Sequence, residues 1–175
     1  TFSETIDTLS RWVAQAGQDR HSLSHHPGFA QDGLDFHPKS AAGRWSSTNY
    51  VFTDVTNSIL LDAGAPGTNY FNEPPPNGSR LNIGPYGNTT QASLSPTNAR
   101  LTVVSLNDGG RAVGTNQFLY WVASGDATGH TVQISYSGDG GATWTTLVSG
   151  VSALASNYLW DTTTWPSTLL GMWEV

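Results

Sequence analysis

The chain has 175 residues, enough for one large domain or two small ones. Charged residues make up only 11 % of it, against roughly 25 % in an average soluble domain, so Ser, Thr, Asn, Gln and Gly must cover the surface. The formal net charge is −6 and Lys39 is the only lysine, which argues against binding to nucleic acid or to an anionic membrane. Cysteine is absent, which excludes disulfides, thiolate metal sites and cysteine catalysis.

The sequence also bears on location. No apolar run approaches the roughly 20 residues that span a bilayer, so we expect no membrane insertion. The chain begins with Thr1 and shows no signal peptide, and we interpret it as a processed or excised segment. The lack of disulfides alone favours the cytoplasm. The Ser-, Thr-, Asn- and Gly-rich surface instead favours a bacterial extracellular or cell-surface protein, which is the location we predict.

One helix is predicted near the start, over residues 8–17. Its apolar residues follow the spacing i, i+3, i+4, i+7 and form a single stripe: Leu9, Trp12, Val13 and Ala16. Gly17 stands where a residue with positive φ ends a helix. Two to three turns are too few to be stable alone, so we expect this helix to pack against other elements.

The pattern of apolar and polar residues changes near Ala99. Residues 18–57 are rich in loops with short apolar stretches, a pattern typical of the coils of a β-helix. After Ala99 the strands become longer and alternate, with Gly, Asn and Asp clusters between them. We predict strands over residues 101–106, 118–123, 131–136, 143–148, 157–160 and 169–175. This series predicts an antiparallel sandwich, with residues 93–100 as the linker before it.

The segment before the linker carries a long motif. Leu61-Asp62-Ala63-Gly64 is followed by Asn72-Glu73-Pro74, Pro76-Asn77-Gly78 and then Arg80-Leu81-Asn82-Ile83-Gly84-Pro85-Tyr86-Gly87-Asn88-Thr89. This order resembles the final coil of bacterial extracellular right-handed parallel β-helix repeat proteins. Ala65 departs from that family, which usually has a second Asp after the Gly. The resemblance implies that Arg80 bonds backbone carbonyls or Glu73.

Residues 99–175 resemble the immunoglobulin or fibronectin type III-like domain that often follows such helices. The expected fold is therefore all-β. A short parallel β-solenoid end with one N-terminal helix, over residues 1–95, is joined to an immunoglobulin-like sandwich over residues 99–175. In the family a further strand usually follows the one that ends like Met172-Trp173-Glu174-Val175, so the sandwich could lack its last strand.

One turn within the sandwich region matches the Asp-box pattern of sialidases. The pattern predicts a hairpin turn in which the Asp side chain bonds loop amides, Gly supplies positive φ and the Trp packs beneath. In sialidases the box lies away from the catalytic centre, and a single copy argues against a propeller. The residues of the pattern are Ser137, Asp139, Gly141, Thr143 and Trp144.

The sequence gives little support for a metal site or a catalytic site. His25 and His26 are adjacent, so in an extended segment they point to opposite faces, and exposed loop histidines are the favoured interpretation for them and for the nearby His21 and His37. Four aspartates could bind calcium, although turn capping is favoured: Asp32, Asp35, Asp54 and Asp62. Polysaccharide-cleaving β-helix enzymes need a basic residue or paired carboxylates. The candidates Lys39, Arg44 and Arg80 lack a matched acid, so we expect no catalysis and no cofactor, with calcium left open.

Seven tryptophans raise the question of sugar binding, because aromatic faces stack on pyranose rings. Most lie in alternating strands and are expected in the core. Trp165, beside Pro166 in a loop, is the one candidate glycan contact.

Both ends of the sequence suggest unpaired β edges, and such edges recruit other chains. Two functions stay open. In the first, the chain is a non-catalytic extracellular structural or cell-surface protein that assembles with its own copies, with Phe2 and Ile6 on a donated strand. In the second, it is the C-terminal accessory fragment of a larger β-helix carbohydrate-active enzyme or adhesin that binds polysaccharide.

Overall fold

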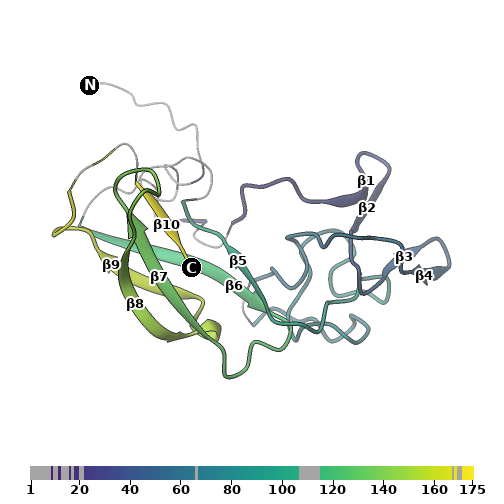
Figure 1. Ribbon diagram of the computed structural model, residues 1–175. Helices are drawn as coiled ribbons and strands as arrows, with labels where there is room; N and C mark the ends of the chain where they lie inside the picture. The colour runs from purple at the N-terminus through teal and green to yellow at the C-terminus, as the bar shows by residue number, and fades with distance from the viewer. Residues whose placement is uncertain are drawn as a thin grey trace. The chain divides into compact units, whose positions relative to one another are not determined.

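The computed structural model describes residues 9, 12, 16, 18–19, 22–65, 67–106, 115–166, 168 and 171–175 (Figure 1). The chain divides into two compact units. One, the strand-rich unit, comprises Thr1–Ser24, Val103–Trp121 and Thr128–Val175. The other, the loop-rich unit, comprises His25–Thr102 and Val122–Ala127. The predicted limits 1–95 and 99–175 stay a prediction.

The second half of the chain carries two three-stranded sheets. One has the order β5-β6-β9 and the other the order β10-β7-β8. Strand β6 pairs antiparallel with β9, and β7 pairs antiparallel with both β10 and β8. The bounds are β5 Arg100–Val103, β6 Asn116–Ser124, β7 Thr131–Ser137, β8 Thr145–Ser152, β9 Asn157–Asp161 and β10 Met172–Glu174, with a 3-10 turn η1 at Ala153–Ala155. Each of the six predicted strands overlaps one of these, so the antiparallel sheets are confirmed, while their immunoglobulin-like identity stays a prediction.

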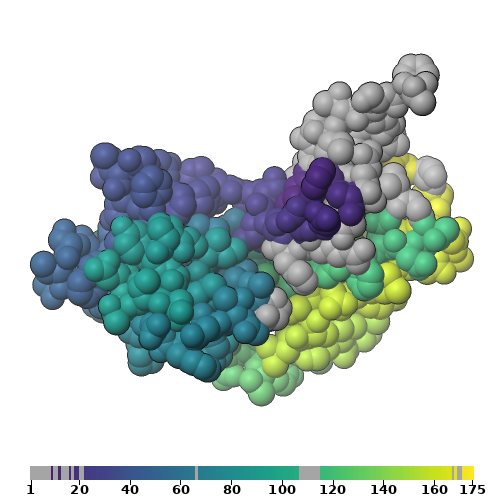
Figure 2. Space-filling view, turned by 180° about the vertical axis from the view of Figure 1, so that it is seen from behind, coloured from purple at the N-terminus to yellow at the C-terminus, as the bar shows by residue number. Residues whose placement is uncertain are grey.

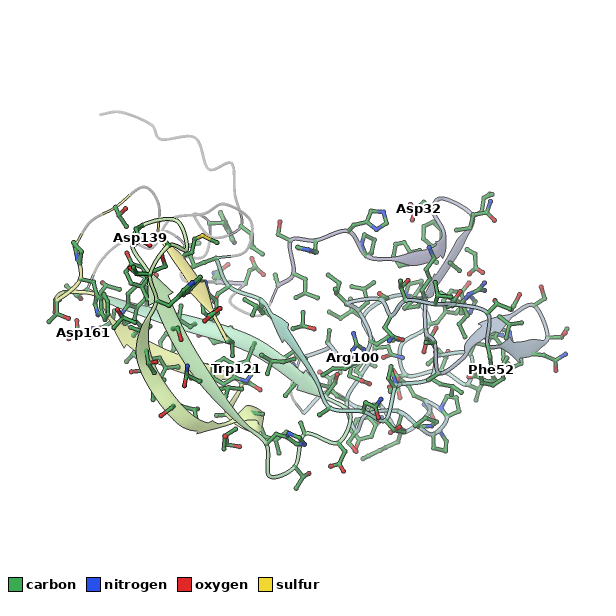
Figure 3. The ribbon with its side chains drawn as sticks, in the orientation of Figure 1. Asp32, Phe52, Arg100, Trp121, Asp139 and Asp161 are labelled. Atoms are coloured by element: carbon green, nitrogen blue, oxygen red, sulfur yellow. The ribbon has the colours of Figure 1, made fainter. Side chains whose placement is uncertain are left out.

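Large apolar side chains fill the strand-rich unit. Trp121 of β6 is 1 % exposed, and its indole N–H donates to the Ala153 carbonyl at 2.7 Å (labelled in Figure 3). Tyr136 of β7 lies 5.0 Å, centroid to centroid, from Trp160 of β9, so these two sheets contact each other through aromatic rings. Complete burial of a side chain of this size contributes about 1.5–3 kcal/mol.

The predicted N-terminal helix falls largely on residues that the structure does not describe. Leu9, Trp12 and Ala16 are helical, as their spacing predicts. The Trp12 indole N–H donates to Asp19 Oδ2 at 2.7 Å. Val13 and Gly17 lie outside the described residues.

The loop-rich unit holds two small hairpins. Strand β1 (Phe29–Gln31) pairs antiparallel with β2 (Asp35–Pro38), and β3 (Arg44–Ser46) pairs antiparallel with β4 (Asn49–Val51). Between β4 and β5 the described residues form turns and bends with no strand. They pack into a continuous surface even so, coloured blue to teal in Figure 2. Both strand pairs of the loop-rich unit are antiparallel, so the parallel solenoid is unconfirmed.

The interior of the loop-rich unit is polar to an unusual degree. Its buried apolar side chains include Leu60, Leu61, Ala63 and Ala92. Buried beside them are Ser40, Ser58, Ser93, Ser95, Asp62, Glu73 and Asn82. The serine hydroxyls donate to carbonyls of distant segments, Ser93 to Pro38 at 2.6 Å, Ser58 to Pro27 and Ser40 to Leu94. Because buried polar groups must be paired to be tolerated, these bonds fix the loops in place.

Candidate functional site

The Asp-box turn joins β7 to β8. Asp139 Oδ1 accepts hydrogen bonds from the Ser137 hydroxyl at 2.7 Å and the Thr143 amide at 2.9 Å, and its Oδ2 accepts from the Thr143 hydroxyl at 2.6 Å. Figure 3 labels Asp139 at this end of the hairpin. The hydroxyl and amide of Thr143, followed by the Ser137 hydroxyl, lower the pKa of Asp139 to about 2. The predicted carboxylate–amide bonding of this turn is confirmed.

The glycines of the turn also match the prediction. Gly140 has φ +74° and Gly141 has φ +89°, and the Gly141 amide donates to the Ser137 hydroxyl at 2.8 Å. Trp144 remains 39 % exposed, so it covers the turn only in part. The turn therefore acts as a rigid connection that fixes where β8 begins.

Strand β8 is the longest edge strand that the described residues contain. It lies at the end of the order β10-β7-β8, with β7 on one side. Its sequence is Thr-Thr-Leu-Val-Ser-Gly-Val-Ser, with no charged residue and no proline. At an edge one row of amides and carbonyls has no strand to pair with, and in β8 this row is interrupted where the register against β7 shifts.

The other edges of these two sheets are shorter and charged. Strand β10 has three residues and includes Glu174. Strand β5 has four residues and begins with Arg100, and β9 has five and ends with Asp161. Charges and short length are the usual devices that keep edges from pairing with another chain. Strand β8 lacks both devices.

Three other residues were predicted to make contacts with partners: Phe2, Ile6 and Trp165. Phe2 and Ile6, the expected donated strand, lie outside the described residues. Trp165 packs against Tyr136 and Trp160, with ring centroids 5.0 and 6.0 Å apart. The one candidate glycan contact thus also belongs to an aromatic cluster of the strand-rich unit.

The described histidines are not part of any cluster that could hold a metal ion. His26 is exposed, as expected for a loop residue, and its Nε2 lies 3.2 Å from Asp32 Oδ2. His37 was predicted to be exposed, and this is wrong because it is only 6 % exposed. Its ring stacks on Tyr86 at a centroid distance of 3.6 Å, and its Nδ1 lies 2.6 Å from Asp35 Oδ1. His21 lies outside the described residues.

The aspartates proposed for calcium bond to protein groups, and Asp35 shares Arg44 with Asp54, because Arg44 Nη1 donates to Asp35 Oδ2 at 3.4 Å. Asp54 Oδ2 accepts from the Ser40 amide at 3.0 Å and lies 2.9 Å from Arg44 Nε. Asp62 accepts from the Ser95 hydroxyl. Within the part of the chain that the structure describes, no group of three or more His, Cys, Asp or Glu residues could hold a metal ion.

The long motif of residues 61–89 contributes to a buried network that the sequence predicts only in part. Arg80 Nε donates to the Gly64 carbonyl at 2.7 Å, which confirms the expected carbonyl bond. Glu73, expected only as an alternative partner of Arg80, is 3 % exposed and accepts hydrogen bonds from the backbone amides of Asn82 and Asn88. Its position before three consecutive prolines was the only local signal that this acid has a fixed place.

The comparisons with known proteins leave the chain without a family. No family model matches it, and neither a curated protein nor a solved structure matches it. Among the described residues, no helix is both long and apolar enough to span a membrane.

Proposed function

We propose that this chain is a non-catalytic extracellular structural or cell-surface protein whose copies associate through the open edge of β8. The observation that carries the proposal is the eight-residue edge strand with neither charge nor proline. An added strand would satisfy its free amides and carbonyls, which is the physical basis of β-augmentation.

The composition of β8 suits a partner that is another copy of the same chain. Each copy carries a net charge of −6, so most pairs of surfaces would repel. Uncharged Ser, Thr, Leu and Val side chains can face a second β8 without placing like charges opposite each other.

The loop-rich unit would then be the closing coils of a β-helix, as its motif suggests. Cross-segment backbone bonds support this idea. The Ser58 amide donates to the Lys39 carbonyl at 2.9 Å and the Leu94 amide donates to the Gly43 carbonyl at 2.8 Å, so segments far apart in the sequence are joined through their backbones. Such a unit would be a structural element rather than a binding groove.

The alternative, a glycan-binding accessory fragment of an enzyme or adhesin, has less support. Its one candidate contact, Trp165, packs against Tyr136 and Trp160. An aromatic ring that stabilises a core cluster has less of its surface free to stack on a sugar.

The test is to place one lysine on the open edge. Ser149 is an exposed residue of β8, and Ser149→Lys adds the charge that natural edges use to prevent pairing. We expect the unsubstituted chain to show concentration-dependent association by sedimentation velocity. We expect Ser149→Lys to weaken that association at least about tenfold, which corresponds to about 1.4 kcal/mol.

The control is Gln133→Lys, which adds the same charge at an exposed position of the central strand β7. Equal weakening by both variants would reject the β8 edge. An unsubstituted chain that stays monomeric at about 1 mM would reject association altogether, because this limits the free energy of association to less than about 4 kcal/mol.

Phe2→Asp separately tests strand donation from the N-terminus. If a donated N-terminal strand joins the copies, this variant should lose association while it keeps the β-type circular dichroism.

A further inference from the structure

Glu73 is a buried acid whose two carboxyl oxygens have unequal surroundings. Oε1 accepts hydrogen bonds from the backbone amides of Asn82 and Asn88, each at 2.9 Å. Oε2 is buried and has no hydrogen-bond partner among the described residues. A charged oxygen that is buried and unpaired is unfavourable, and a proton on it would remove the charge without disturbing the two amide bonds.

A second buried acid lies in the same network. Asp62 is fully buried, and its amide donates to Asn82 Oδ1 at 2.8 Å, while the Asn82 amide donates to Glu73. The positive charges of Arg100 and Arg80 favour the ionised form of Asp62. Burial nevertheless raises the pKa of Asp62, and its Oδ2 is also buried without a hydrogen-bond partner among the described residues, so the two arginines compensate its charge only in part.

Among the described groups that act on Glu73, none carries a positive charge. The negative charge of Asp62 acts on Glu73 and disfavours its ionised form. The other titratable neighbour is Tyr50, whose hydroxyl donates to the Ala92 carbonyl at 2.8 Å. Burial and then the charge of Glu73 raise the pKa of Tyr50, so Tyr50 stays neutral and offers no positive charge.

We propose that Oε2 of Glu73 is a proton-binding site, and that protonation there stabilises the loop-rich unit as the pH falls from neutral to mildly acidic. This regulation concerns the folding of the loop-rich unit and does not depend on pairing at β8. The free energy of unfolding of the loop-rich unit would therefore increase under mildly acidic conditions. Ordinary acid denaturation has the opposite direction.

The direction follows from proton linkage. Burial raises the pKa of Glu73 above its ordinary 4.5, the Asn88 and Asn82 amides oppose that shift, and the Asp62 charge adds to it. The folded state then holds a proton that the unfolded state has lost, so stability rises as the pH falls through the folded pKa. The gain is complete below the ordinary value of 4.5. One proton changes the folding constant by at most about tenfold per pH unit.

The direct measurement uses the small number of glutamates. The chain has three, Glu4, Glu73 and Glu174, so side-chain carboxyl labelling of glutamate gives three NMR signals from the intact chain. We expect one signal, absent from Glu73→Gln, to titrate above pH 4.5. If all three titrate at or below that value, the proposal is wrong.

Hydrogen exchange gives the second readout. Amides of the loop-rich unit should be more protected at pH 5 than at pH 7.5 after correction for intrinsic rates, and Glu73→Gln should abolish the difference. Glu174→Gln removes the same charge from an exposed position and should preserve it. If Glu73→Gln does not fold, Asp62→Asn gives the second readout, because it removes the facing charge and should lower the pH at which the raised signal titrates. If no glutamate signal of the unsubstituted chain titrates above pH 4.5, the proposal is overturned whatever that variant does.

Discussion

At the scale of single residues, the loop-rich unit depends on close contacts between backbone and buried carboxylate. Gly78 has φ +55°, and a Cβ there would lie 2.3 Å from Asp62 Cγ. Glycine is therefore required at this position for two reasons. It adopts the positive φ without strain, and it leaves space for the Asp62 carboxylate. The same Asp62 carboxylate accepts a hydrogen bond from Ser95, so the glycine allows three distant segments to meet.

We expect Gly78→Ala to lower the free energy of unfolding by about 2–4 kcal/mol, since positive φ costs about 1–2 kcal/mol and the clash adds to it. Gly33→Ala is the matched control, because Gly33 has φ +77° but no atom within 4 Å of the added Cβ. Urea unfolding of both variants measures the difference. Equal losses would show that the Asp62 contact contributes nothing beyond backbone strain.

At the scale of elements, the strands after Ala99 were predictable because alternation is a local signal. The structure corrects their bounds. Strand β8 begins at Thr145 rather than at Thr143, because Thr143 bonds Asp139 and so belongs to the turn. The strand also continues to Ser152 despite a positive φ at Gly150, through irregular pairing with β7.

The candidate sites were predictable only where their contacts are local. The Asp-box bonds join residues within the segment 137–144 and were anticipated from the pattern. Burial of His37 depends on Tyr86, 49 positions further along the sequence (86 − 37 = 49), and was missed. The network of Glu73 likewise joins amides that the sequence alone could not place together.

The β7–β8 turn should respond to acid through Asp139. Its pKa is about 2, below the ordinary 3.8, so its stabilisation is fully present above pH 3.8 and is lost as the pH falls through about 2. We expect Asp139→Asn to lower the hydrogen-exchange protection of the Gly141 and Thr143 amides at neutral pH and to remove their pH dependence in this window. Asp32→Asn makes the same charge change in the β1–β2 turn and should leave these two amides unchanged. Retained protection in Asp139→Asn would mean that the backbone alone fixes the turn.

At the scale of the whole molecule, scarcity of charge is the dominant property. Only 11 % of the residues are charged, and the sequence pI is about 5.0. The surface therefore relies on neutral polar groups for contact with water, and the net charge of −6 is the main long-range repulsion between copies at neutral pH.

This balance predicts how association should depend on salt. At pH 7.5, raising the ionic strength from about 0.05 to 0.5 M shortens the Debye length to a few ångströms, which screens the repulsion and should strengthen association. At pH 5.0, the calculated pI, the net repulsion is gone and salt should have little effect. Sedimentation velocity at the two pH values and two salt concentrations measures both effects. If association instead weakens with salt at pH 7.5, the contact is an ionic one, and the uncharged β8 edge cannot be its main component.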